Sequence, residues 1–276
     1  MSNFLANIIK GIVGRLKPPT HQGRFKSIGW LQEKILKHED DQQEKSKTLN
    51  GMPVYYQRPY ELLHTYDELF VGEMYRFQAV TDQPVILDCG ANIGLSVLYF
   101  KQLYPHANIW AFEPDENNFR LLEKNIAVNH LSHVQAVPKA VWVEDGYVSF
   151  LANGTEASRI TDESLAANGQ QVPCVRLAGV LRNFDQVDFL KMDIEGGEHK
   201  VIPDCADELH RVRNLFLEYH GRTSDNIQLT NLLSIVQQQG FMVYIRNAAD
   251  SLVHPFTEKQ GTAQYDVQLN IFCYKK

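Results

Sequence analysis

The sequence has few cysteines, no long apolar run and no excess of positive charge. Its 276 residues include four cysteines, scattered without a CxxC pair, so they offer neither a disulfide framework nor the usual spacing of a zinc site. We therefore expect a reducing compartment, the cytoplasm. No stretch reaches the roughly 20 apolar residues that cross a bilayer, so no transmembrane segment is expected. The net charge of −6 argues against nucleic acid as a partner.

The first residues form a separate amphipathic segment. No basic region precedes its apolar part and no small-residue cleavage site follows, so it is a poor signal peptide. Pro18 and Pro19 end a run in which apolar residues recur at helical spacing, namely Phe4, Leu5, Ile8, Ile9, Ile12, Val13 and Leu16. We expect a helix packed on the body of the protein or on a second subunit, which makes a homodimer our hypothesis. A membrane-interface or carrier-docking helix is the alternative.

The chain divides into an N-terminal region and a longer catalytic region. Residues 38–48 are polar and charge-dense, which is typical of a linker or of a solvated helix face. A helical segment at 28–36 precedes them. Residues 1–80 are therefore predicted to be an N-terminal helical extension that caps the catalytic domain, and residues 81–276 to be that domain.

From residue 85 onward, short apolar strands alternate with helices. We expect helices near 95–103, 116–129 and 229–239, a hairpin strand at 147–151, a short extended run at 174–177, and sheet strands near 85–87, 109–112, 134–137, 187–192, 215–217, 241–245 and 268–274. This alternation predicts an α/β fold with a mostly parallel sheet covered by helices on both faces. The carboxyl ends of parallel strands meet at one edge, where ligands bind, and four acids fall there: Asp88, Glu113, Asp193 and Glu218.

A glycine-containing loop follows the first of these strands. Gly90 and Gly94 permit a tight turn that a ligand can approach closely, and the helix after Gly94 offers unpaired N–H groups to a carboxylate. Glu113, at the end of the next strand, can accept hydrogen bonds from a ribose diol. Asn92 and Leu95 occupy the second and third glycine places of the dinucleotide pattern GxGxxG. The loop therefore suits a nucleoside with an amino-acid tail; a sharp turn beside a solvated glutamate is the plain structural alternative.

A second acidic group follows the strand at 187–192. Asp193, Glu195 and Glu198 would repel one another there unless they are solvated or a cation lies near them: a sulfonium, a metal or Lys191. Glu218 and His220 share one side of the next strand by sequence parity. Since the imidazole pKa lies nearest neutrality, His220 is the preferred general base. A purely structural histidine is the alternative.

Several stretches together resemble the FkbM family of methyltransferases. They are ILDCGANIGLS, AFEPDENNFRLLEKN, AVWVEDGYVSF, VRLAGVL, VDFLKMDIEGGEHKVI and LFLEYH, in this order between Val85 and His220. The resemblance implies a seven-stranded, Rossmann-like class I methyltransferase fold that uses S-adenosyl-L-methionine. It also implies O-methylation of a hydroxyl on a small molecule, such as a polyketide, a sugar or another natural product.

The same resemblance assigns residues to roles. It places the amino-acid tail of the cofactor against Asp88, Gly90, Ala91, Asn92 and Gly94. It places the ribose at Glu113, with Pro114 beside it, and the adenine near Ala140 and Val141. The methyl-transfer space would lie between Asp193 and Glu195 on one side and Glu218 and His220 on the other, and these four are the expected catalytic residues. Asp193 is also expected to contact the cofactor.

Three alternatives stay open at this stage. Magnesium at Asp193 and Glu218 would suit hard oxygen ligands, but the histidine-base mechanism is preferred and no metal is assigned. A nucleotide-dependent oxidoreductase would use a similar sheet, yet the missing glycines count against it. A non-catalytic S-adenosylmethionine-binding or assembly module would have no need of a base. The N/D-P-P-Y pattern of many N-methyltransferases is absent after the fourth strand.

Overall fold

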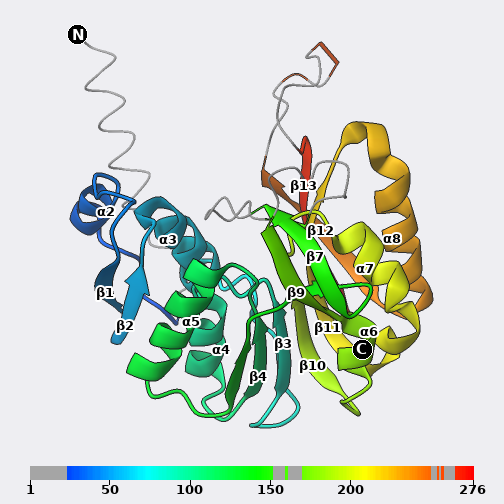
Figure 1. Ribbon diagram of the computed structural model, residues 1–276, viewed down its shortest axis with the longest axis horizontal. Helices are drawn as coiled ribbons and strands as arrows, with labels where there is room; N and C mark the ends of the chain where they lie inside the picture. The colour runs from blue at the N-terminus through cyan, green and yellow to red at the C-terminus, as the bar shows by residue number, and fades with distance from the viewer. Residues whose placement is uncertain (1–23, 152–158, 161–169, 250–253, 255, 258–264) are drawn as a thin grey trace.

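A seven-stranded sheet forms the centre of the protein in a computed structural model that describes residues 24–151, 159–160, 170–249, 254, 256–257 and 265–276 (Figure 1). Its strands run in the order β12-β13-β11-β10-β3-β4-β5. In chain order their bounds are β3 Val85–Cys89, β4 Asn108–Phe112, β5 Val134–Val137, β10 Val187–Met192, β11 Val212–Gly221, β12 Met242–Ala249 and β13 Val267–Tyr274. The predicted class I methyltransferase-like architecture is confirmed.

The strand order reverses between β3 and β10. From β3 the chain continues outward through β4 and β5, whereas β10 leads in the opposite direction to β11, and these five strands are mutually parallel. Strand β13 runs antiparallel to both of its neighbours, β11 and β12. A reversal of this kind opens a crevice at the carboxyl ends of the two strands, which is where ligands bind in open α/β sheets.

Each face of the sheet has its own apolar core. Ile86 and Phe189 point into one core, and the next residues along their strands, Leu87 and Leu190, point into the other. The first core is covered by α4 (Leu95–Leu103) and α5 (Glu116–Val128), and the second by α6 (Leu177–Leu181), α7 (Glu198–Asp204) and α8 (Asn226–Gln238). Burial on both faces explains why β10 contains six consecutive buried residues rather than an alternating pattern.

The N-terminal region is not entirely helical, contrary to the prediction. It contains α2 (Trp30–Leu36), α3 (Pro59–Tyr66) and the π-helix η1 (Asp67–Val71), but also a hairpin of β1 (Lys45–Leu49) and β2 (Met52–Tyr56). Part of the polar stretch at 38–48, expected to be a linker or a helix face, is therefore a strand. The reason is the Asn50-Gly51 turn, whose φ angles of 47° and 81° are those that join two twisted strands.

The N-terminal region packs into the first core of the sheet. Phe25, Tyr66 and Phe70 lie against Tyr99 of α4 or against one another, with ring centroids 4.8–5.6 Å apart. Residues on both sides of position 80 thus share one apolar cluster. The amphipathic helix expected at Phe4–Leu16, on which the homodimer hypothesis rests, lies outside the described residues.

A small second sheet lies beside the main one, in the order β6-β9-β7-β8. Its strands are β6 Ala140–Trp142, β7 Gly146–Leu151, β8 Arg159–Ile160 and β9 Gln170–Arg176. The expected hairpin strand at 147–151 is β7, which pairs antiparallel with both β8 and β9. Sequence reasoning missed β6, which places Ala140 and Val141 at the cavity described below. Among the described residues no helix is long and apolar enough to span a membrane.

Candidate active site

The glycine loop lies at the point where the strand order reverses. The N–H groups of Gly90 and Ala91 both donate to the carbonyl of Phe112, at 3.0 and 2.9 Å, so the loop is fastened to the end of β4. Gly90 has a φ of +85°, and a Cβ at this position would lie 1.9 Å from the carbonyl oxygen of Asp193. Only glycine therefore lets the loop after β3 approach the chain leaving β10 so closely.

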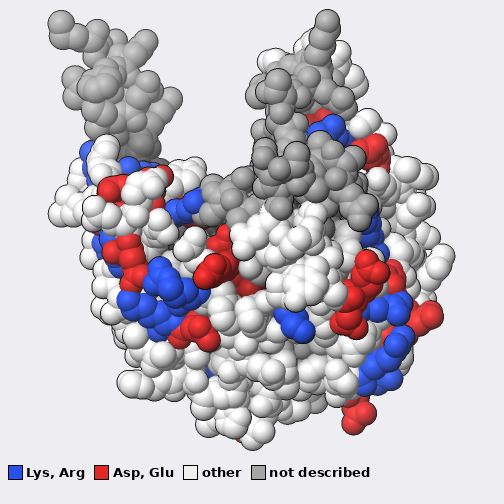
Figure 2. Space-filling model, in the orientation of Figure 1, with Lys and Arg blue, Asp and Glu red and all other residues white. Residues whose placement is uncertain are grey.

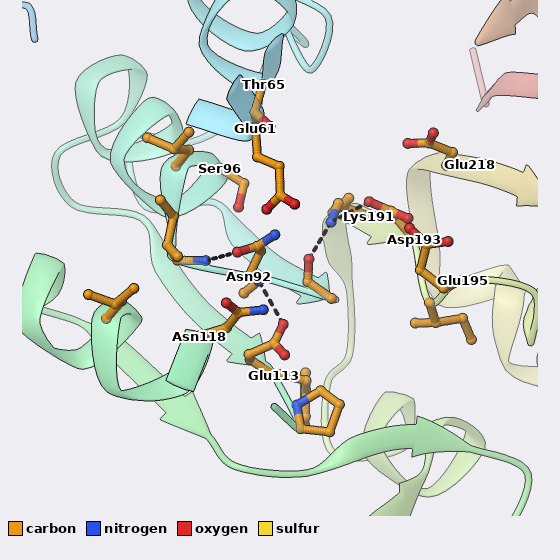
Figure 3. A pocket seen from close by; sticks show the side chains of 18 of the residues that line it. Glu61, Thr65, Asn92, Ser96, Glu113, Asn118, Lys191, Asp193, Glu195 and Glu218 are labelled. Carbon is orange, nitrogen blue, oxygen red and sulfur yellow. Dashed lines mark hydrogen bonds and ion pairs between the residues drawn. The ribbon is translucent and has the colours of Figure 1, made fainter. Parts of the chain in front are cut away.

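Glu113, which follows β4, holds the glycine loop through a hydrogen bond to its backbone. One oxygen of its carboxylate accepts the N–H of Asn92 at 2.8 Å (Figure 3). The other oxygen accepts the N–H of Asp115 at 2.9 Å. Burial raises the pKa of Glu113 to about 7, although both hydrogen bonds favour the charged form. Each oxygen still has a lone pair available for a further donor.

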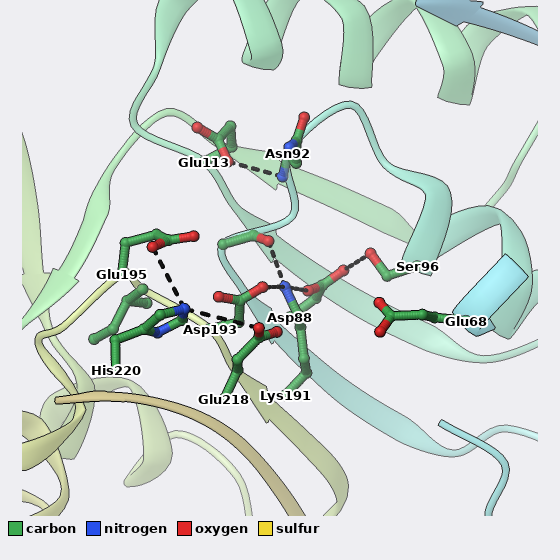
Figure 4. A network of polar contacts seen from close by, with 12 residues as sticks. Glu68, Asp88, Asn92, Ser96, Glu113, Lys191, Asp193, Glu195, Glu218 and His220 are labelled. Atoms are coloured by element: carbon green, nitrogen blue, oxygen red, sulfur yellow. Dashed lines mark hydrogen bonds and ion pairs between the residues drawn. The ribbon is translucent and has the colours of Figure 1, made fainter. Parts of the chain in front are cut away.

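Lys191 of β10 links the glycine loop after β3 to Asp193 after β10. Its ammonium donates to the carbonyl of Gly90 at 2.5 Å and lies 3.2 Å from Asp193 and 3.6 Å from Asp88 (Figure 4). Asp88, fully buried, also accepts a hydrogen bond from the hydroxyl of Ser96. Burial alone would lower the pKa of Lys191, but neighbouring acidic groups, Asp193 first, raise it well above its ordinary value. Lys191 is thus a permanent cation in the floor of the site.

The acidic group at the other end of the crevice surrounds His220. Its Nε2 lies 3.5 Å from Glu195 and 3.7 Å from Glu218 (Figure 4). Its Nδ1 lies 3.7 Å from Glu198. Burial raises the pKa of Glu195 to about 9 and that of Glu218 to about 8. Burial opposes a charge on His220 as well, but the carboxylates, Glu198 first, raise its pKa to about 10. The surrounding carboxylates therefore favour a proton on the ring.

The turn after β10 has an unusual backbone that the sequence EGGE makes possible. Glu195 and Gly196 have φ angles of +58° and +103°. The buried carboxylate of Glu198 accepts the N–H groups of Ile194 and Gly196, both at 3.2 Å, and so fixes the turn. The hydroxyl of Tyr265 donates to the carbonyl of Glu195 at 2.7 Å, and its ring lies 5.3 Å from that of His220. Sequence reasoning missed Tyr265 because it lies in a segment without a motif.

One cavity contains most of the predicted site residues. It is lined by Gly90, Ala91, Asn92, Glu113, Pro114, Ala140, Val141, Asp193, Glu195 and Glu218. Asp88, Gly94 and His220 do not line it. Asp88 lies beneath the loop, Gly94 packs against Leu122, and His220 stands behind the two glutamates. Asp88 and His220 instead contact residues that do line the cavity, Lys191 for the first and Glu195 and Glu218 for the second.

The N-terminal region supplies a further wall of the cavity. Helix α3 and its neighbours contribute Arg58, Glu61, Thr65 and Glu68 to the cavity lining. On the face shown in Figure 2, acidic side chains gather in the hollow near the middle of the molecule. The cavity is therefore rich in carboxylates, and a cationic ligand would be stabilised there.

The chain is similar to known methyltransferases. Residues 88–243 match the model of the methyltransferase FkbM domain. Methyltransferase sdnD of Sordaria araneosa is 31% identical over 212 residues, covering 64% of this chain and 80% of that protein. The 31-O-demethyl-FK506 methyltransferase FkbM of Streptomyces tacrolimicus is 25% identical over 230 residues, covering 70% and 87%.

A solved structure shows a similar fold. It is the methyltransferase FkbM from Methylobacillus flagellatus KT, with a TM-score of 0.48 and 18% identity; the match covers 79% of this chain and 54% of that one, so this chain corresponds to about half of its length. Because the family model spans more than half of the sequence and includes the glycine loop, Glu113 and the EGGE turn, the chain belongs to the FkbM family of methyltransferases.

Proposed function

We propose that the protein is an S-adenosylmethionine-dependent O-methyltransferase that acts on a hydroxyl of a small molecule. One observation carries this proposal: a single cavity joins the glycine loop and Glu113 at one end to the carboxylates of Glu195 and Glu218 at the other. A methyl donor and an acceptor held at these two ends would meet between them. The names of two relatives, the 31-O-demethyl-FK506 methyltransferase and the 2-O-methyltransferase NoeI, describe transfer to oxygen.

The residues at the first end fit the cofactor. Gly90, Ala91 and Asn92 line the cavity where the amino-acid tail would lie, and the close approach of Gly90 to Asp193 fixes the position of this loop. Glu113 is held by two backbone N–H groups and keeps acceptor capacity for the ribose hydroxyls. Ala140 and Val141 offer an apolar edge for the adenine. When bound, the sulfonium supplies an electrophilic methyl group.

The protein's task is then alignment, exclusion of water and removal of a proton. Glu195 and Glu218 face the cavity, so either carboxylate can meet an acceptor hydroxyl directly. His220, our predicted general base, lies behind both, so it would take up the acceptor proton through Glu195 or Glu218 rather than directly. Helix α3 forms the opposite wall, which gives the N-terminal region a part in selecting the acceptor.

Calorimetric titration with S-adenosylhomocysteine tests the cofactor. We expect saturable binding by the wild type, and a loss of about 10-fold or more in Glu113→Ala, since a hydrogen bond to a charged group is worth roughly 1.5–3 kcal/mol. Glu123→Ala, which changes an exposed glutamate of helix α5, is the matched control and should bind normally. No binding by folded wild-type protein, or binding of NADH instead, would refute the proposal.

Transfer of a radioactive methyl group to hydroxyl-bearing polyketides and sugars tests the reaction. Turnover is expected to fall strongly in Glu218→Gln, because this change removes a carboxylate that faces the cavity and leaves its shape intact. Cofactor binding without transfer to any acceptor class would favour the non-catalytic binding module.

A further inference from the structure

Three potential metal ligands converge at the acidic end of the cavity. Asp193 and Glu195 follow β10, and His220 lies near the end of β11. Each offers one ligand atom, and these atoms all lie within 4.8 Å of one another. Within the described part of the chain, this is the only group of three or more His, Cys, Asp or Glu residues with such a spacing.

The atoms of this group face one another without the hydrogen bonds that buried polar atoms normally make. The His220 side chain is only 3% exposed; its Nε2 is the nitrogen that faces the carboxylates of the group, while its Nδ1 lies toward Glu198 and has no hydrogen-bond partner. Its Nε2 lies 3.5 Å from Glu195 and 3.7 Å from Glu218, farther than in a normal hydrogen bond. In Asp193 one carboxylate oxygen lies 3.2 Å from Lys191, while the other is buried and accepts no hydrogen bond. Buried groups left in this state usually have an additional partner.

We propose that Asp193, Glu195 and His220 bind one divalent cation of the first transition row, such as Mn²⁺. Two carboxylates and an imidazole form a mixed oxygen and nitrogen set, which suits such a cation better than Mg²⁺, whose protein ligands are mainly oxygens. A single divalent cation would also balance the charge of the two carboxylates. The ligand set differs from the Asp193 and Glu218 pair that the sequence suggested, because it takes the imidazole and Glu195 instead of Glu218.

The surroundings of the three residues favour the same arrangement. Glu198 lies 3.7 Å from Nδ1 of His220, on the side away from Glu195, as expected of a carboxylate that orients a ligating histidine. Tyr265 fixes the carbonyl of Glu195 and packs near the imidazole ring. The ligands are thus held by groups that would not themselves bind the cation.

The cation would act on the acceptor. Asp193 and Glu195 line the cavity, so a cation between them would be accessible to a ligand hydroxyl and would lower its pKa. Glu218, outside the ligand set, would remain free to take the proton. This consequence rests on the proposed function, whereas cation binding itself requires neither cofactor nor acceptor.

Titration of the metal-stripped full-length protein with Mn²⁺, followed by electron paramagnetic resonance, tests the proposal. We expect one saturable site per chain, with an electron spin-echo coupling between Mn²⁺ and an imidazole nitrogen. His220→Ala should abolish the nitrogen coupling and weaken binding by about 10-fold or more. Glu195→Gln, a change at the cavity surface, should weaken Mn²⁺ binding by a similar factor. It provides the test of the site if His220→Ala does not fold. His210→Ala, which removes an exposed histidine, should change neither property.

The proposal is overturned if no saturable binding appears up to millimolar Mn²⁺. It is also overturned if bound Mn²⁺ shows no nitrogen coupling, or if His220→Ala behaves like His210→Ala. Titration of the same samples with S-adenosylhomocysteine keeps the two hypotheses apart. Mn²⁺ binding without cofactor binding would refute the methyltransferase function alone, and the reverse result would refute the cation site alone.

Discussion

Replacing Gly90 by alanine tests the close approach that defines the crevice. Gly90 has a φ of +85°, and an added Cβ would lie 1.9 Å from the carbonyl oxygen of Asp193. Gly51, in the β1–β2 turn, has nearly the same φ of +81° but no atom within 4 Å of an added Cβ. Gly51→Ala is therefore a matched control that has the same backbone strain without the overlap.

The two variants should differ by the cost of that overlap. A left-handed backbone costs a residue with a Cβ roughly 1–2 kcal/mol, and this applies at both positions. At Gly90 the chain must also move to relieve the overlap, which adds about 1–3 kcal/mol by analogy with overpacked cores. We therefore expect Gly90→Ala to lower the free energy of unfolding by about 2–5 kcal/mol and Gly51→Ala by about 1–2 kcal/mol.

Urea unfolding measures the stability difference, and calorimetry with S-adenosylhomocysteine measures its consequence for the site. Gly90→Ala should lose at least about 10-fold in affinity, since the loop can no longer lie against Asp193 without distortion. Gly51→Ala should bind like the wild type. Equal losses of stability in the two variants, or unchanged affinity in Gly90→Ala, would show that the crevice tolerates a side chain and that the proposed seat of the cofactor tail is wrong.

Two further predictions concern buried charges. Lys191→Met leaves the fully buried Asp88 without its cation and should lower the free energy of unfolding, measured in urea, by about 3–5 kcal/mol. The control Lys26→Met changes an exposed lysine and should stay within about 0.5 kcal/mol of the wild type. A loss below about 1 kcal/mol in Lys191→Met would contradict the ion pair between Lys191 and Asp88. The pKa of Glu113 is about 7 in the folded protein and 4.5 ordinarily, so the folded state binds this proton more tightly than the unfolded state does. The protonated Glu113 therefore stabilises the ligand-free protein by about 3 kcal/mol, fully below pH 4.5, and this contribution is lost as the pH rises through 7. Glu113→Gln should flatten that slope in urea titrations from pH 4 to 8 and Glu123→Gln should not; an unchanged slope in Glu113→Gln would exclude the raised pKa.

The sequence predicted the main sheet well because its strands are buried on both faces. β5 and β10 coincide with the expected ranges, and β3 and β4 differ by two residues or fewer at their ends. Such strands are continuous apolar runs, which local composition reveals directly. The hairpin of β1 and β2 was missed because its first strand, KSKTL, is polar on its solvent face and follows a charged stretch. Its pairing depends on the Asn50-Gly51 turn.

The candidate site could be predicted in outline from the same regularity. Parallel strands bring their carboxyl ends together, so acids at the ends of β3, β4, β10 and β11 had to gather at one edge. The sequence could not show their depth. Asp88 was expected against a ligand, but it lies beneath the loop, because Ser96 and Lys191 come between it and the cavity.

His220 shows most clearly where sequence reasoning ends. Parity along the strand placed it on the same side as Glu218, and the two side chains do meet, with 3.7 Å between Nε2 and a carboxylate oxygen. Its burial, however, depends on β11 continuing to Gly221, on Glu198 of helix α7 and on Tyr265, which is distant in the sequence. These long-range contacts place the ring behind the cavity wall. A histidine that cannot reach a substrate directly can still act on it through what it holds, a proton shared with carboxylates or a cation, and the Mn²⁺ titration distinguishes these two cases.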